Sequence, residues 1–152
     1  MELRDHLIHL VAYEKWANEQ WLDFFEASTN HPGGGQLAAR GDEWLEHIVG
    51  CYRHWLNLLS ETQDESVGDL RKDLADQTER FSAFIASCDF DKPLRRTWEE
   101  YGTYEWTTLQ IIYHAISHGS YHRGHIRAIA EELGFDDWPD TDFEAFTGVK
   151  IS

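Results

Sequence analysis

"TTLQIIYHAISHGSYHRGHIRAIAEELG", residues 107–134, predicts a long helix near the end of the chain. Thr107 or Thr108 can cap its start, because a threonine hydroxyl accepts a hydrogen bond from a free backbone amide of the first turn. Gly134 can close its end, because glycine readily adopts the left-handed conformation that often follows a helix. The segment also contains four of the nine histidines in the chain. It therefore predicts both a helix and the place where a site is expected.

Three further helices are predicted by apolar residues that recur at steps of three and four, the period of one helical face. The first spans about residues 3–27. It is followed by "STNHPGGGQ", which is typical of a loop because a proline and three glycines interrupt a helix. The second helix begins at an Asp42 cap and ends near Ser60, and the third begins at a Ser66 cap and ends near Cys88.

The segment between Pro93 and Trp106 has a different pattern, with aromatic and β-branched residues around a glycine in "TWEEYGTYEW". This composition favours a short hairpin. Four long helices with few strands predict an all-α fold, a four-helix bundle of antiparallel type. We expect one domain over residues 1–152, and a one-turn helix near Phe143 in a tail that lies over the end of the bundle.

The composition limits the kinds of partner. The 152 residues are enough for one domain with a buried core, and 28 acidic against 13 basic residues give a formal net charge of -15. Such a surface repels phosphate backbones and anionic lipids, so we expect neither nucleic acid nor a membrane as a partner. No signal peptide or membrane-spanning run of eighteen apolar residues is expected. Cys51 and Cys88 are too few for a disulfide framework, which favours a reducing cytoplasm.

Three histidines of the last long helix share one face. His114, His118 and His122 are spaced four apart, so each is rotated by only about 40° from the one before. His118 and His122 form an H-x-x-x-H pair, a spacing at which two imidazoles can bind one ion from adjacent turns. The alternative is a polar helix whose histidines are exposed or hydrogen-bonded. A further histidine from a facing helix would favour a metal site.

The second helix offers such a histidine. His47 directly precedes Ile48 and Val49 at the border of the buried face, where an imidazole must be hydrogen-bonded, paired or ligating. His54 lies seven residues further on and on nearly the same face, so geometry alone leaves both open. Cys51, one turn from His47, is a further candidate ligand, although a small buried apolar side chain is its simpler interpretation.

Four segments carry a resemblance to a known family, namely "YEKWANEQWL" (13–22), "HIVGCYRHWL" (47–56), "SHGSYHRGHI" (117–126) and "LGFDDWPDTDF" (133–143). Together they resemble the DinB superfamily (DinB/YfiT-like) of small four-helix metalloenzymes. The resemblance covers nearly the whole chain in the right order. In that family one histidine of helix two and both histidines of an H-x-x-x-H-R-G segment bind a divalent metal. The resemblance therefore implies His47, His118 and His122 as metal ligands and leaves His54 outside the set.

The resemblance also implies roles for other residues. His125 replaces the glutamine that usually follows "HRG", which changes the hydrogen bonds around the ligands or adds a proton acceptor. His114 either orients a ligand or is an ordinary surface histidine. Arg123 is expected to pair with a carboxylate of another helix. Residues that match the family's first helix are expected to pack inside the bundle, namely Tyr13, Trp16, Ala17 and Asn18.

Three neutral imidazoles leave at least one position open on a zinc ion, which is typical of a catalytic site. A water or thiol bound there can lose its proton near neutral pH. With the resemblance, this favours a low-molecular-weight-thiol S-transferase in detoxification or stress response over a metal-dependent hydrolase. A third alternative is a non-catalytic metal or small-ligand binding module, or histidines that are only structural. Glu14, Tyr121 and His125 are candidate general bases.

The metal and the partners are defined only by class. Imidazole ligands suit several divalent ions, so we expect zinc, nickel or a similar metal. The expected partners are a small-molecule substrate, with a low-molecular-weight thiol among the candidates, and a second copy of the chain. A homodimer is implied by the resemblance and favoured by the many large aromatic side chains, which are common at interfaces. Metal affinity is expected to fall as the pH drops through about 6 to 7, because a ligating imidazole must be neutral.

Overall fold

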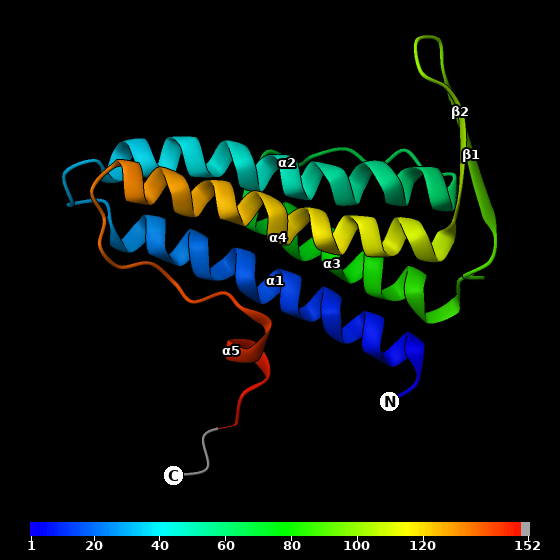
Figure 1. The fold of residues 1–152 in the computed structure, drawn as a ribbon, viewed down its shortest axis with the longest axis horizontal. Coiled ribbons are helices and arrows are strands. Elements are labelled where there is room, and N and C mark those ends of the chain that lie inside the picture. The colour runs from blue at the N-terminus through cyan, green and yellow to red at the C-terminus, as the bar shows by residue number, and fades with distance from the viewer. Residues whose placement is uncertain (150–152) are drawn as a thin grey trace.

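A computed structural model describes residues 1–149, and the last three residues of the expected domain lie outside the described part. Four long helices form a bundle, a two-stranded hairpin joins the third helix to the fourth, and a short helix follows in the C-terminal tail (Figure 1). The predicted all-α bundle and its hairpin are confirmed. No helix among the described residues is long and apolar enough to cross a membrane. The elements are α1 (Leu3–Ala27), α2 (Gly34–Ser60), α3 (Leu70–Ser87), β1 (Pro93–Trp98), β2 (Gly102–Thr107), α4 (Thr108–Glu132) and α5 (Phe143–Thr147).

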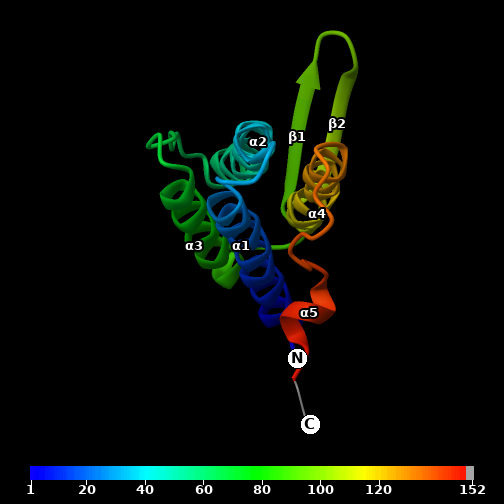
Figure 2. The ribbon, with the colours of Figure 1, turned by 90° about the vertical axis from the view of Figure 1, so that its left-hand side faces the viewer.

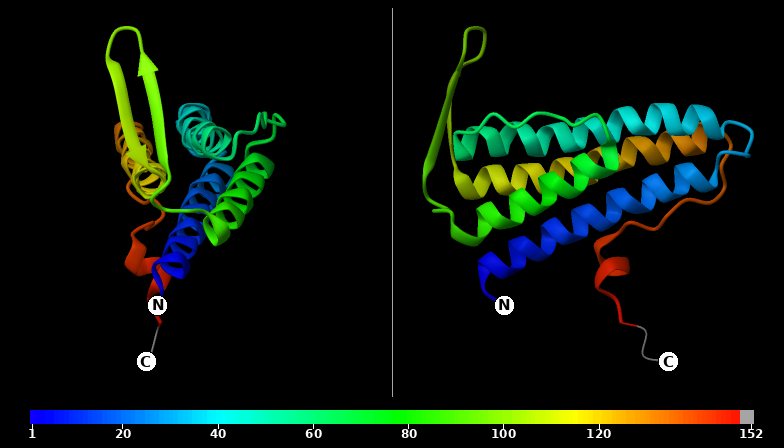
Figure 3. Two further views of the ribbon diagram at one scale, coloured as in Figure 1. Left: turned by 90° about the vertical axis from the view of Figure 1, so that its right-hand side faces the viewer. Right: turned by 180° about the vertical axis from the view of Figure 1, so that it is seen from behind.

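The helices do not alternate in direction around the whole bundle. α1 and α4 run one way and α2 and α3 run the other, because residues 61–69 return along α2 before α3 begins (Figures 1 and 3). Asn57 holds this return segment, since its amide group donates to the Asp64 carbonyl at 2.9 Å and accepts from the Asp64 backbone N–H at 3.1 Å. Arg80 of α3 donates to the Asp64 carboxylate at 2.8 Å. The expected antiparallel arrangement is therefore wrong for the pair α2 and α3.

Helix α4 has the ends that its sequence predicts. The Thr107 hydroxyl accepts from the Gln110 backbone N–H, and the Gln110 side chain accepts in return from the Thr107 N–H, which completes a capping box. Beyond the last turn Gly134 has a φ of +81°, the left-handed conformation expected of it. The helix that carries four histidines is thus fixed at both ends by local interactions.

Helix α2 begins at Gly34 and not at Asp42, so the predicted start is wrong. Gly33 supplies the left-handed residue before the helix, with a φ of +91°. A side chain at Gly34 would place its Cβ 2.0 Å from the Ser28 carbonyl oxygen. The glycine-rich segment therefore opens a helix at a point where two backbones lie too close for any side chain.

Helix α3 begins close to the predicted position but with a different cap. The Asp69 carboxylate, and not the Ser66 hydroxyl, accepts a hydrogen bond from the Lys72 backbone N–H in the first turn, at 2.9 Å. Ser66 donates instead to the carboxylate of Asp73, which also pairs with Arg53 of α2 at 3.1 Å. These contacts fasten the start of α3 to the middle of α2.

The C-terminal tail returns along α1. Short helix α5 lies where a one-turn helix was expected, but it packs on the side of α1 and not over the bundle end (Figures 1 and 2). Its Phe146 ring lies 5.1 Å from the His9 ring and 5.4 Å from the Trp16 ring. The Tyr13 hydroxyl donates to the Thr141 carbonyl at 2.8 Å. Aromatic residues of the first helix therefore hold the tail in place.

A buried ion pair joins α1 to α4. Arg123 donates to the two carboxylate oxygens of Glu14 at 2.7 and 2.9 Å, and both side chains are almost fully buried. The hydroxyl of Tyr52 on α2 donates to the same carboxylate at 2.6 Å, and the side-chain oxygen Oδ1 of Asn18 accepts from Arg123 at 3.0 Å. The expected pairing of Arg123 with a carboxylate of another helix is confirmed. Because its oxygens are occupied by these donors, Glu14 is a structural residue here and not the free general base considered above.

Gly119 lets this ion pair approach α4. A Cβ at Gly119 would lie 1.8 Å from a carboxylate oxygen of Glu14, whereas a Cβ at Gly124 on the same helix would meet no atom within 4 Å. We expect Gly119→Ala to lower the free energy of unfolding by about 3 kcal/mol, the cost of disrupting a buried ion pair. Gly124→Ala should raise it by about 0.5–1 kcal/mol, because alanine favours a helix more than glycine does. Urea unfolding of the two variants measures both changes, and equal effects would contradict this role of Gly119.

Candidate metal site

Three histidines from two helices converge on one point. His47 comes from α2, and His118 and His122 come from α4, which packs beside α2. Each residue offers a ring nitrogen, and the three nitrogens lie within 4.8 Å of one another. The Nε2 atoms of His118 and His122 are 3.0 Å apart, close to the roughly 3.3 Å that separates two nitrogens on one tetrahedral zinc ion. The three residues implied by the sequence are therefore brought together and could hold a metal ion.

The environment keeps two of these imidazoles neutral, the form that coordinates metal. Burial, together with the nearby rings of His122 and His47, lowers the pKa of His118 to about 4. Burial also lowers the pKa of His122, again with a contribution from His47. The Nδ1 of His118 is buried and has no hydrogen-bond partner among the described residues. A neutral imidazole carries a lone pair on one ring nitrogen, which it could offer to a metal ion.

His125 lies where it can orient a ligand. Its Nδ1 is 3.1 Å from the Nδ1 of His122, so one of these two nitrogens donates a proton to the other. If His122 donates, its Nε2 carries the lone pair and points toward His118. A contact of this kind fixes the tautomer and orientation of a ligating imidazole. The structure thus supports the expected effect of His125 on the hydrogen bonds around the ligands.

Trp44 forms one wall of the histidine cluster. Its ring stacks on His122 with a centroid distance of 4.7 Å, lies 4.6 Å from the ring of His125, and meets His47 edge-on at 6.0 Å. The sequence interpretation missed this residue. Its position three residues before His47, on the same face of one helix, is the signal that would have found it.

The open side of the cluster faces a groove of about 350 Å³. His54 lies in this groove but outside the group of three, as the resemblance implied. His114 also lies in the groove, with its ring 5.4 Å from that of His118. Burial raises the pKa of the Cys51 thiol to about 11, so this side chain is protonated at neutral pH and fits the interpretation of a small apolar residue. The groove is lined by His47, Gly50, Cys51, His54, Trp55, His114 and His118.

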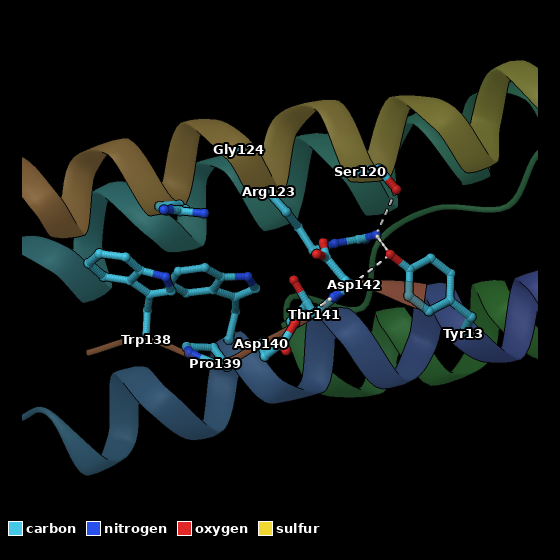
Figure 4. A pocket seen from close by; sticks show the side chains of 11 residues that line it. Tyr13, Ser120, Arg123, Gly124, Trp138, Pro139, Asp140, Thr141 and Asp142 are labelled. Atoms are coloured by element: carbon cyan, nitrogen blue, oxygen red, sulfur yellow. Dashed lines mark hydrogen bonds between the residues drawn. The ribbon is translucent and has the colours of Figure 1, made fainter. Parts of the chain in front are cut away.

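A larger cavity of about 480 Å³ lies between α1, α4 and the tail (Figure 4). It contains none of His47, His118 and His122 in its lining. Arg123 projects into it but is already paired with Glu14, as described above. Arg127 lies over the ring of Trp138, 4.7 Å from its centroid. The residues around this cavity therefore join the tail to the bundle. The three candidate metal ligands lie at the groove and not at this cavity.

Comparison with known proteins identifies the family of the chain. The model of the DinB family matches residues 3–147. The chain belongs to the DinB family. A relative in this DinB group, the protein named "Protein DinB" of Bacillus subtilis (strain 168), is 26% identical over 161 aligned residues that cover 93% of each chain. No solved structure matches the chain. The family match covers the helices that carry all three histidines.

The low pKa of His118 gives a pH prediction. Between pH 6.5, the ordinary pKa, and about pH 4 the unfolded chain binds a proton on His118 that the folded protein does not, so the metal-free protein should lose stability as the pH falls through this range. Zinc should raise the melting temperature at neutral pH. The sequence predicted that metal affinity falls as the pH drops through about 6 to 7 and that the gain is much smaller near pH 5, but the lowered pKa of His118 should extend part of the gain toward pH 4.

Melting curves with zinc and with a chelator, recorded from pH 7.5 to 4, measure this gain. Curves that coincide at every pH would contradict metal binding. A gain that stays constant down to pH 4 would contradict binding through imidazoles.

Proposed function

We propose that this DinB-family protein is a metal-dependent enzyme that binds one divalent ion, zinc, nickel or a similar metal, through His47, His118 and His122. The convergence of three ring nitrogens from two helices carries the proposal. All three ligands are neutral groups, so the double positive charge of the ion would remain available to an anionic ligand. Since the cluster opens on a groove, a small molecule can reach it from one side.

The reaction proposed first is the transfer of a low-molecular-weight thiol to an electrophile, as in detoxification or stress response. A divalent ion at the three histidines would lower the pKa of a thiol beside it. The thiol sulfur then forms a bond to an electrophilic carbon, the leaving group departs with its electron pair, and the thiol proton goes to solvent. No Asp or Glu is among the described residues that line the groove. This lining supports thiol transfer, because a thiolate needs no carboxylate base.

The second candidate is a metal-dependent hydrolase, and His114 is the observation that favours it. Its ring lies 5.4 Å from that of His118, and burial lowers its pKa, so it is neutral at pH 7. A neutral imidazole beside the groove could accept the proton of an attacking water. Tyr121 is a less suitable base because it lies on the outer side of His122, largely exposed.

A cobalt-substituted sample distinguishes these candidates. Addition of a low-molecular-weight thiol such as cysteine should change the visible absorption spectrum of bound cobalt if the sulfur reaches the ion. His47→Ala should remove most of the bound metal, whereas His54→Ala, a groove residue on the same helix, should retain it. A spectrum unchanged by thiol would favour the hydrolase. If His54→Ala loses the metal while His47→Ala keeps it, the assignment of the α2 ligand is wrong.

We also propose that the protein forms a homodimer, as the family resemblance and the aromatic content suggested. Among the described residues several large side chains are strongly exposed, including Tyr101 at 70% and Tyr121 at 66%. Exposed aromatic residues are common at contacts between protein chains. Sedimentation equilibrium at micromolar concentration should give twice the 17.8 kDa chain mass. A mass near that of one chain would contradict the proposal.

A further inference from the structure

The hairpin has two chemically different faces. On one face Arg95 pairs with Glu105 at 2.6 Å, and the hydroxyl groups of Thr97 and Thr103 hydrogen-bond at 2.8 Å. The other face is aromatic. The rings of Trp106 and Tyr104 are stacked with a centroid distance of 5.8 Å, and that of Trp98 lies 5.9 Å from Trp106. A hairpin that only connected two helices would not need one polar and one aromatic face.

The aromatic face continues the wall of the histidine groove. Trp106 meets Trp55 edge-on at 6.0 Å, and Trp55 meets His114 at 5.6 Å. His114 is next to His118 of the candidate metal site, as given above. Figures 2 and 3 show the hairpin rising beside α2 and α4, beyond the end of the bundle. An unbroken row of rings therefore leads from the three histidines to the hairpin.

Arg96 provides a positive charge at the far end of this row. It lies on the aromatic face, with its guanidinium carbon 5.5 Å from the centroid of the Trp98 ring. Burial lowers the pKa of His54, a residue of the groove, and the positive charge of Arg96 lowers it in the same direction. In a chain with 28 acidic residues, Arg96 forms no ion pair with any residue in the described range 1–149. Its neighbour Arg95 is paired, so the free charge is specific to the aromatic face.

We propose that the groove and the aromatic face of the hairpin bind a planar aromatic carboxylate, with its ring against Trp55 and Trp106 and its carboxylate on Arg96. The inference rests on the proposed function, because it names the substrate class of the same site. Tryptophan rings offer flat apolar surfaces to an aromatic ring, and a guanidinium binds a carboxylate through paired hydrogen bonds. The end of the ligand opposite its carboxylate would then face the three histidines, where a reaction would take place.

The test uses 2-naphthoate as the probe and the full-length protein in a chelator, so that it does not depend on metal binding. Isothermal titration should detect 2-naphthoate binding, and Arg96→Gln should weaken it at least about tenfold, as expected for loss of a charge-assisted hydrogen bond. Arg95→Gln, on the same strand but the opposite face, should bind as the unaltered protein does. The neutral analogue 2-naphthalenemethanol should bind more weakly and equally to all three proteins.

Three results would overturn the inference. One is the absence of 2-naphthoate binding. Another is binding that Arg96→Gln leaves unchanged. The third is binding that appears only when zinc is added, which would place the carboxylate on the metal and support the metal site while rejecting the role of Arg96. If the aromatic face is instead the contact between two copies, 2-naphthoate will not bind, and Trp106→Leu will lower the mass measured by light scattering.

Discussion

The ion pair between Glu14 and Arg123 is the constraint on which the arrangement of the bundle depends. Both groups are almost fully buried, and a buried charge without its partner costs several kcal/mol. Arg123 must therefore face α1, and this fixes the rotation of α4. Because His122 directly precedes Arg123, its side chain is turned by about 100° from that of the arginine, toward α2. The ion pair that joins α1 to α4 therefore also turns the histidines of α4 toward α2.

Helix α4 consequently has two polar faces that differ in how their side chains are hydrogen-bonded. On the face toward α1, the charge of Arg123 is neutralised by Glu14 and its other donors bind Asn18, Tyr13 and Ser120. On the face toward α2, the imidazoles have few partners, and burial favours their neutral forms. The first face has completed its hydrogen bonds and is structural. The second retains unused nitrogen lone pairs, which is the condition under which a protein site binds a metal ion.

The hairpin adds further side chains beside the face of α4 that carries the histidines. Helices α2 and α4 provide the three histidines, and His47 and His118 line a groove of about 350 Å³ beside them. The hairpin places Trp98, Trp106 and Arg96 beside that groove. Figure 2 shows the two strands beside α2 and α4. The three histidines could hold a metal ion, and the residues of the hairpin would then choose the substrate. One fold can support different reactions when different residues surround its site.

The sequence alone determined the local features. Helices α1 and α4 begin and end where periodicity and caps predict, the hairpin lies where β-branched and aromatic residues gather, and the H-x-x-x-H pair places two histidines on one face because helical geometry depends only on spacing. The family resemblance chose His47 over His54, which spacing could not do. The start of α2 was mispredicted because Gly34 is required by a contact with Ser28, a residue outside the helix.

Only the tertiary structure decided how these elements meet. The return of residues 61–69 along α2, the occupation of Glu14 by Arg123 and Tyr52, and the wall that Trp44 forms over His122 all join residues distant in sequence. Likewise, only the tertiary structure shows that Arg96 has no ion-pair partner among the described residues. Sequence patterns report the preferences of single elements, whereas pairing, burial and pKa depend on which groups the fold brings within a few ångströms of one another.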